Sequence, residues 1–208
     1  MFRSKREGVI VPQAEHARLS GAIAAVWARP VPLPFEPFVR GVTLHDRGYG
    51  ELDDDEIESI KPDRWVEVQS RGFRARSGDA VVDLVVALHI RRLIGRDEHP
   101  ARAALAREID AALPDLLAAA GASEADARAA DAVTQLCDRI SFVFCSGTAE
   151  GGEVAGIRFR YDGDATTTLD PWPLAVPWLR GVVGGFAAEG YPERLDPVVR
   201  LFRVEPAE

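Results

Sequence analysis

Residues with metal-binding side chains occur along this sequence in a suggestive order: a histidine, a histidine–aspartate pair and a distant aspartate. They are His16, the adjacent His45 and Asp46, and Asp138. The gaps between them are too long for a local motif such as a helical His-x-x-x-His pair, and they suit a bundle in which each helix contributes one ligand. Imidazole nitrogen and carboxylate oxygen together favour a divalent transition metal such as Mn, Fe, Co, Ni or Zn. We therefore predict a metal centre that holds one or two ions.

A further histidine, His89, lies in the most apolar stretch of the chain, residues 79–94. A single buried histidine is usually a hydrogen-bonded core residue. Together with the other four residues, it is predicted to be either a metal ligand, which would allow a second ion, or the acid of a catalysed reaction. The alternative for the whole set is a buried His–Asp hydrogen-bonded network that holds no ion.

The elements that must position these residues are mostly helices. Apolar residues at helical spacing and strong helix formers predict five of them. Their ranges are 13–28, 38–46, 79–94, 99–120 and 124–146. Residues 61–78 contain Pro62, Gly72 and Gly78 and are expected to be irregular.

After Gly147 the composition changes to one typical of strands. Residues 154–161 alternate between apolar and polar side chains, and residues 166–169 would be their partner across a turn at Asp162-Gly163. Residues 198–204 predict a third strand. The predicted fold is therefore mainly α, with a small antiparallel β-hairpin or sheet at the C-terminal end.

The length of 208 residues suits a single domain, with a helical core over about 11–147 and a β appendage over about 152–206. The net charge of −8, without any Lys/Arg-rich run, argues against nucleic acid as a partner. No stretch approaches the about 20 apolar residues that cross a membrane. Cys137 and Cys145 would be about 12 Å apart along one helix, too far for a disulfide. We expect free thiols and a cytoplasmic protein, and the sequence leaves a homo-oligomer open.

The order His, His-Asp, Asp resembles the motif of the HD superfamily of metal-dependent phosphohydrolases. In that superfamily the first histidine, the doublet and the last aspartate bind a divalent metal, which the resemblance places at His16, His45, Asp46 and Asp138. Additional histidines let some members hold a second ion, and His89 would take that position. The resemblance implies an HD-domain-like helical bundle that acts on a phosphorylated small molecule.

Five blocks along the chain are also similar to those of an uncharacterised bacterial family, domain of unknown function 3891. The blocks are Val11-Pro12-Gln13-Ala14-Glu15-His16, Leu44-His45-Asp46-Arg47-Gly48-Tyr49, Val86-Ala87-Leu88-His89, Gln135-Leu136-Cys137-Asp138-Arg139-Ile140-Ser141 and Leu169-Asp170-Pro171-Trp172-Pro173. Tyr49 stands where we expect the family's usual Trp, a departure that would change the shape of the pocket. This resemblance supports the site and leaves the reaction open.

Several polar residues adjoin the predicted ligands in sequence. Arg47 and Arg139 could hold a substrate phosphate in a bidentate contact, and Arg47 is a candidate catalytic residue beside His89. Gln13 and Gln135 each precede a predicted ligand by three residues, on the same helix face. The predicted substrate-binding residues are Arg139, Gln13, Gln135 and Tyr49. Ion pairs and core hydrogen bonds are the competing interpretation, and we expect an ion pair for Arg92.

The leading functional hypothesis is a metal-dependent hydrolase of a phosphorylated small molecule. The metal would lower the pKa of a bound water and neutralise charge on phosphate oxygens. Two alternatives stay open, since a fold does not determine a reaction. One is a di-iron oxygenase on the same helical scaffold, and the other is a non-enzymatic domain that senses a metal or a ligand.

Overall fold

The computed structural model describes residues 1–4, 7–95 and 99–207. Its helices are α1 (Gln13–Ala24), α2 (Phe35–Thr43), α3 (Pro62–Arg74), α4 (Ala80–Ile94), α5 (Pro100–Ala120) and α6 (Glu124–Ser146). Two short 3-10 helices, η1 (Tyr49–Leu52) and η2 (Ile57–Ser59), lie between α2 and α3. The strands are β1 (Phe2–Ser4), β2 (Val9–Val11), β3 (Glu150–Val154), β4 (Ile157–Tyr161), β5 (Thr166–Asp170), β6 (Leu179–Ala187) and β7 (Pro197–Pro206).

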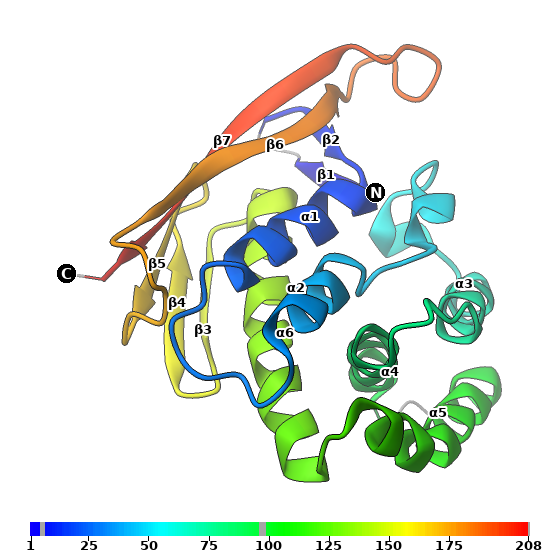
Figure 1. The fold of residues 1–208 in the computed structure, drawn as a ribbon. Coiled ribbons are helices and arrows are strands. Elements are labelled where there is room, and N and C mark those ends of the chain that lie inside the picture. Colours follow the sequence, from blue (N-terminus) through cyan, green and yellow to red (C-terminus); the bar gives the residue numbers. More distant parts are fainter. Residues whose placement is uncertain (5–6, 96–98, 208) are drawn as a thin grey trace.

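The strands form one seven-stranded sheet in the order β1-β2-β6-β7-β5-β4-β3. Neighbours are antiparallel except β5 and β7, which are parallel. Figure 1 shows the sheet curling along one side of α1 and α6, while α3, α4 and α5 lie farther from it. The prediction of a mainly α fold with a small β-hairpin is therefore wrong, because strands from both ends of the chain join in a sheet that forms a whole layer.

Three strands, β1, β2 and β6, were not predicted because their sequences lack the usual strand pattern. β1 and β2 have three residues each, too few to show an alternating pattern. β6 contains Gly181, Gly184 and Gly185, which lower strand propensity. Two of these glycines are needed for close approach: a Cβ at Gly181 would lie 2.6 Å from the Phe202 ring, and one at Gly185 would collide with the backbone oxygen of Ile10.

Residues 154–161, predicted as one strand, are the end of β3, a turn and β4. Ala155 and Gly156 have φ values of 54° and 73°, and the chain reverses there. The predicted alternation is confirmed within β4, where Ile157, Phe159 and Tyr161 are all buried.

Residues 61–78 are not irregular as predicted, because α3 covers most of them. Pro62 takes the first helical position, where its missing N–H has no helical partner to lose. Gly72 lies near the end of α3, where a Cβ would come within 2.6 Å of the backbone oxygen of Arg47. Pro62 therefore begins this helix, and Gly72 lets it pack closely against the chain that follows α2.

Two apolar cores meet along α4. One lies between the sheet and α1, α2 and α6, and it includes Val81 and Val85 of α4. The other joins α3, α4 and α5, and it includes Leu84 and Ile90 of α4. Since α4 contributes to both, its burial on nearly all sides is confirmed, as its apolar sequence predicted.

The prediction of free thiols is confirmed. Cys137 and Cys145 are both buried in α6 and free. Within the described ranges, no helix combines the length and the apolar character needed to span a bilayer.

Gly21 of α1 lets this helix pack closely against the end of α2. A Cβ there would lie 2.9 Å from Thr43 Cβ and 3.1 Å from Thr43 Cα. We expect Gly21→Ala to lower the free energy of unfolding by about 1–3 kcal/mol through overpacking. Urea denaturation should show a much smaller loss for Gly50→Ala, since a Cβ at Gly50 would meet only the Asp53 carboxylate, at 3.8 Å. Equal stability of the two variants would contradict the close packing.

Candidate metal centre

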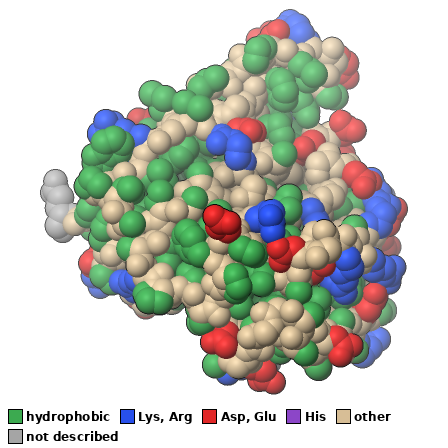
Figure 2. Space-filling model, in the orientation of Figure 1, with side chains coloured by type: hydrophobic (Ala, Val, Ile, Leu, Met, Phe, Trp, Pro, Cys, Tyr) green, Lys and Arg blue, Asp and Glu red, His purple; other side chains and the backbone are tan. Residues whose placement is uncertain are grey.

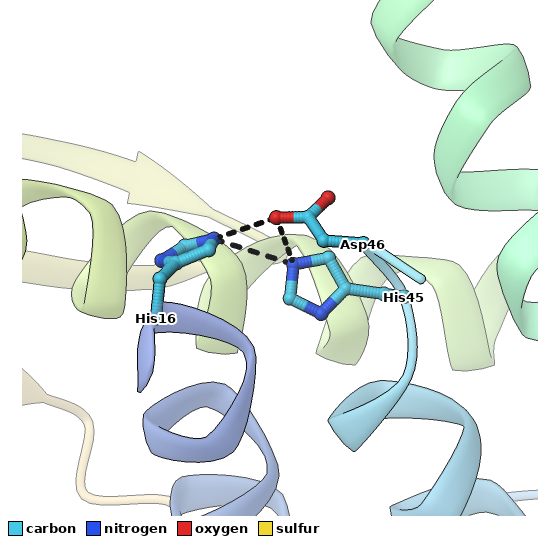
Figure 3. Close-up of side chains that lie close together, drawn as sticks. All are labelled: His16, His45 and Asp46. Atoms are coloured by element: carbon cyan, nitrogen blue, oxygen red, sulfur yellow. Dashed lines mark hydrogen bonds and ion pairs between the residues drawn. The ribbon is translucent and has the colours of Figure 1, made fainter. Parts of the chain in front are cut away.

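The five predicted residues converge from four places in the fold. His16 lies near the N-terminal end of α1, His89 on α4 and Asp138 on α6. His45 and Asp46 lie in the turn after α2, because that helix ends at Thr43 and not at residue 46 as predicted. Figure 3 shows the side chains of His45 and Asp46 projecting from this turn toward His16.

The site is shielded from solvent. His16, His45 and His89 are 2%, 0% and 1% exposed, and Asp46 is 8% exposed. The Asp138 side chain is the most accessible of the five, at 15%. No histidine surface is visible on the face of the molecule drawn in Figure 2.

The Nε2 atoms of two histidines lie close to each other, and each lies close to one oxygen of Asp46 and one oxygen of Asp138. The Nε2 atoms of His16 and His45 are 3.3 Å apart. His16 Nε2 lies 3.3 Å from Asp46 Oδ2 and 3.2 Å from Asp138 Oδ1. His45 Nε2 lies 3.4 Å and 3.6 Å from the same two oxygens.

These distances match the edges of a tetrahedral metal complex. Ligand bonds of about 2.0–2.2 Å place neighbouring ligand atoms about 3.3–3.6 Å apart in a tetrahedron and about 2.8–3.1 Å apart in an octahedron. The five separations run from 3.2 to 3.6 Å. The potential ligand atoms of His16, His45 and Asp46 lie within 4.8 Å of one another, and Asp138 Oδ1 lies within 3.6 Å of both histidines. We treat these four residues as a candidate His₂Asp₂ set for one divalent ion.

Hydrogen bonds at Nδ1 direct the Nε2 atoms of both histidines into the centre, where each can offer a lone pair to a metal ion. His45 Nδ1 lies 2.6 Å from the backbone oxygen of Val42, which can only accept, so Nδ1 carries the proton. Ser141 Oγ donates to the backbone oxygen of His16 at 2.8 Å, so it accepts from His16 Nδ1. Such partners commonly orient metal-binding histidines.

His89 has a different arrangement from the other two histidines. Its Nε2 lies 3.0 Å from Asp46 Oδ1, and its Nδ1 lies 3.0 Å from Arg92 Nη2. Because a guanidinium can only donate, Nδ1 accepts and the Nε2–H group donates to Asp46. In this arrangement His89 orients the Asp46 carboxylate and turns Oδ2 toward the centre.

The charges around the centre fit a divalent cation. Asp46, Asp138 and Asp131 are three carboxylates, and Arg92 contacts both Asp138 and Asp131 at 3.3 Å. With neutral histidines, these four groups leave two negative charges in a buried region, which is costly unless a cation compensates them. The predicted ion pair of Arg92 is confirmed.

Without an ion, a proton must compensate instead. Burial alone would lower the pKa of His45, but the Asp46 and Asp138 carboxylates raise it to about 9. Burial also opposes ionisation of these two aspartates, yet the neighbouring histidines hold the pKa of both below the ordinary value. For His89, burial and the charge on His45 lower the pKa. The metal-free centre thus holds a proton on His45 that a metal ion would displace.

Ser141 tests whether the outer hydrogen bonds matter. We expect Ser141→Ala to weaken metal binding about 10–100-fold, because His16 Nδ1 loses its acceptor. Ser146→Ala is a matched control on the same helix, since Ser146 Oγ donates to the backbone oxygen of Val143 and to no other group among the described residues. Competition with a chromophoric chelator measures both affinities, and equal affinities would show that Ser141 does not hold His16 in place.

A cavity of about 220 Å³ is lined by His16, Asp46 and Asp138 of the centre and by His89. The predicted substrate residues Gln13 and Tyr49 both line it, together with Trp65 and Gln69 of α3. Its apolar wall consists of Phe2, Ile57, Leu93, Ile94 and Phe142. The centre is therefore accessible to a small molecule through a largely apolar space.

Gln135 and Arg139, the other two predicted substrate residues, do not line this cavity. They line a second one of about 430 Å³, which also contains Arg92 and shares Asp138 with the first. Arg139 forms an ion pair with Glu150 in this cavity. The predicted substrate residues thus divide between two cavities that meet at the metal centre.

Arg47, the predicted catalytic arginine, lines neither of these two cavities. Its Nη1 donates to Asp83 Oδ1 at 2.8 Å, and its Nε donates to the backbone oxygen of Gly72 at 2.6 Å. These contacts tie the His45-Asp46 turn to α3 and α4, so the geometry gives Arg47 a positioning role.

Three residues of the site were not anticipated. Ser141 follows Asp138 by three residues on α6, a spacing that places it on the same helix face. Gln69 and Trp65 were missed because residues 61–78 were expected to be irregular. A helical interpretation of that segment, with Pro62 as its first residue, would have drawn attention to both.

These features describe a domain in which helices hold a His₂Asp₂ centre beside a curled sheet. A family model described as "Protein of unknown function (DUF3891)" matches residues 1–180, and the chain belongs to this family. The matched region includes all five residues of the centre. Searches of the curated proteins and of the solved structures returned no match.

Proposed function

We propose that this protein is a metal-dependent hydrolase of a phosphorylated small molecule. The observation that carries the proposal is the convergence of His16, His45, Asp46 and Asp138, with each histidine Nε2 3.2–3.6 Å from both carboxylates, next to a cavity that His16, Asp46 and Asp138 line. The order of the ligands along the chain supports the phosphohydrolase class, through its resemblance to the HD superfamily. A divalent ion bound there would act as a Lewis acid that activates water and offsets charge on phosphate oxygens.

Residues of the chain supply the remaining functions in this proposal. Arg92 lines the second cavity next to Asp138, where its guanidinium can contact an anionic group of the substrate. A move of Arg92 toward that group would free His89 Nδ1, its present acceptor, to take up or release a proton. His89 is therefore the proposed acid–base residue, oriented by Asp46.

The proposed ion is a transition metal, because two imidazoles and two carboxylates form a mixed nitrogen–oxygen set. We also propose a cytoplasmic location, which the two free, buried thiols support.

The test is a phosphatase assay with untagged protein loaded with Mn, Fe, Co, Ni or Zn. We expect metal-dependent release of inorganic phosphate from small phosphate monoesters, and loss of that release in EDTA and in Asp138→Asn. Asp110→Asn is a matched control, since Asp110 forms an ion pair with Arg91 near the protein surface. Protein that holds a full equivalent of metal yet releases no phosphate from the panel would contradict the proposal.

A di-iron oxygenase is a second candidate, which one observation favours. His45, His89 and Asp138 form a second group whose potential ligand atoms lie within 4.8 Å of one another, and it overlaps the group His16, His45 and Asp46. Two irons per chain, a visible charge-transfer band and no phosphate release would favour this candidate. A tightly bound ion with no turnover of any kind would instead favour the sensing domain.

A further inference from the structure

The cavity beside the metal centre contains buried polar groups that lack a hydrogen-bond partner. Both polar atoms of the Gln13 amide, Oε1 of Gln69 and the hydroxyl of Tyr49 form no hydrogen bond of normal geometry with any described residue, while the Gln69 side chain lies beside the Tyr49 hydroxyl. These side chains belong to residues that are only 1%, 5% and 2% exposed, and all three line the same cavity. An unsatisfied buried polar group costs about 1–3 kcal/mol. Three side chains with such groups on one cavity wall are expected where a ligand supplies the missing hydrogen-bond partners.

The chemistry of these groups specifies what the ligand must carry. The amide oxygens of Gln13 and Gln69 need N–H or O–H donors, while the Gln13 N–H groups need an acceptor. Burial and the Asp46 carboxylate raise the pKa of Tyr49 well above its ordinary value, so its hydroxyl remains protonated and can donate. The ligand therefore presents donors and acceptors side by side.

The rest of the wall indicates a small and uncharged group. Apart from Asp46 and Asp138 of the metal centre, Arg102 is the one charged side chain among the described residues of this wall. Phe2, Trp65 and Phe142 are aromatic, and the volume of about 220 Å³ is below the about 300–1,000 Å³ of pockets for drug-sized ligands. A single planar ring fits this description better than a sugar or a fused ring system.

We propose that this cavity binds a neutral, planar, single-ring group whose edge carries a carboxamide or a lactam. Gln13, Gln69 and Tyr49 pair with that edge, and the aromatic wall contacts the faces of the ring. This inference rests on the proposed function, because the group would be the part of the hydrolase substrate next to the bond that is cleaved.

The test uses three probes of one size on metal-loaded protein: benzamide, acetophenone and benzoate. Dissociation constants come from NMR titration. We expect benzamide to bind at least about tenfold more tightly than acetophenone, which keeps the carbonyl oxygen but lacks the N–H donors. Equal binding of the two would overturn the proposal, and so would tighter binding of benzoate, which would assign the cavity to an anion.

Substitutions of the wall residues test whether the selectivity for benzamide arises in this cavity. Gln69→Leu should weaken benzamide binding about tenfold, leave acetophenone binding unchanged and leave thermal stability equal or higher, since it removes an unsatisfied polar group. Gln135→Leu, the same change in the other cavity, should alter neither affinity. Tyr49→Phe removes the hydroxyl that donates to the ligand carbonyl, so it should weaken benzamide and acetophenone binding alike, and it provides the second test if Gln69→Leu does not fold. Unchanged benzamide selectivity in Gln69→Leu, or unchanged affinity for both probes in Tyr49→Phe, would overturn the assignment.

The readout does not require turnover, so the two proposals fail separately. Benzamide selectivity without phosphate release would contradict the hydrolase but keep the neutral-ligand site. Phosphate release without benzamide selectivity would keep the hydrolase and reject this ligand class.

Discussion

The His45→Ala variant is expected to retain less than about one-tenth of the metal that the wild-type protein holds after dialysis. His45 supplies one of the four ligand atoms, 3.3–3.6 Å from the other three. Loss of a partner that only orients a ligand already weakens metal binding about 10–100-fold, and loss of a ligand itself should cost more. Any metal-dependent turnover should disappear with the ion.

Elemental analysis of untagged protein measures this loss, with His99→Ala as the matched control. His99 lies next to the N-terminal end of α5, where its side chain is 36% exposed and pairs with Asp63 at 3.5 Å. We expect His99→Ala to keep its metal. A similar loss in both variants, or full occupancy in His45→Ala, would show that the ion binds elsewhere.

The metal-free protein is expected to lose about 3 kcal/mol of stability between pH 6.5 and pH 9. The pKa of His45 is about 9 in the folded metal-free chain, against an ordinary value of 6.5. Since the folded state has the higher pKa, protonation of His45 stabilises the fold fully below pH 6.5, and this contribution is lost as the pH rises through about 9. The difference between these two pKa values corresponds to about 3 kcal/mol.

Urea denaturation in EDTA at several pH values measures the slope of the free energy of unfolding against pH. With a bound ion the slope should largely vanish, because the metal requires the unprotonated Nε2 of His45. The His45→Ala variant should also lack it. If the free energy of unfolding depended on pH in the same way for wild type and His45→Ala in EDTA, that result would contradict a proton held on His45 by the two carboxylates.

The predicted ligands could be proposed from the sequence because their chemistry is distinctive and their helices have strong signals. The apolar pattern of residues 79–94 places His89 on a buried helix, and a capping box of Ser123 and Asp126 marks the start of α6. The seven-stranded sheet was hidden, since β1 and β2 are very short and the glycines of β6 serve packing. Strand propensity counts these glycines as unfavourable, although the close packing of β6 against its neighbours requires them.

The arrangement around the ligands could not be predicted, because it depends on contacts between distant elements. The Ser141 hydroxyl meets His16 across 125 residues, and His89 meets Asp46 across 43. Gln135 and Arg139 were grouped with Gln13 and Tyr49 because each of them adjoins a predicted ligand in sequence. Adjacency does not reveal that α6 directs the first two residues into a different cavity.

Anomalous diffraction from crystals of metal-loaded protein tests the central claim most directly. We predict one strong anomalous peak about 2.0–2.2 Å from Nε2 of His16 and His45 and from one carboxylate oxygen each of Asp46 and Asp138. A second, weaker peak near His89 would favour a two-metal centre. The absence of any peak at these four atoms in protein that carries a full equivalent of metal would contradict the account.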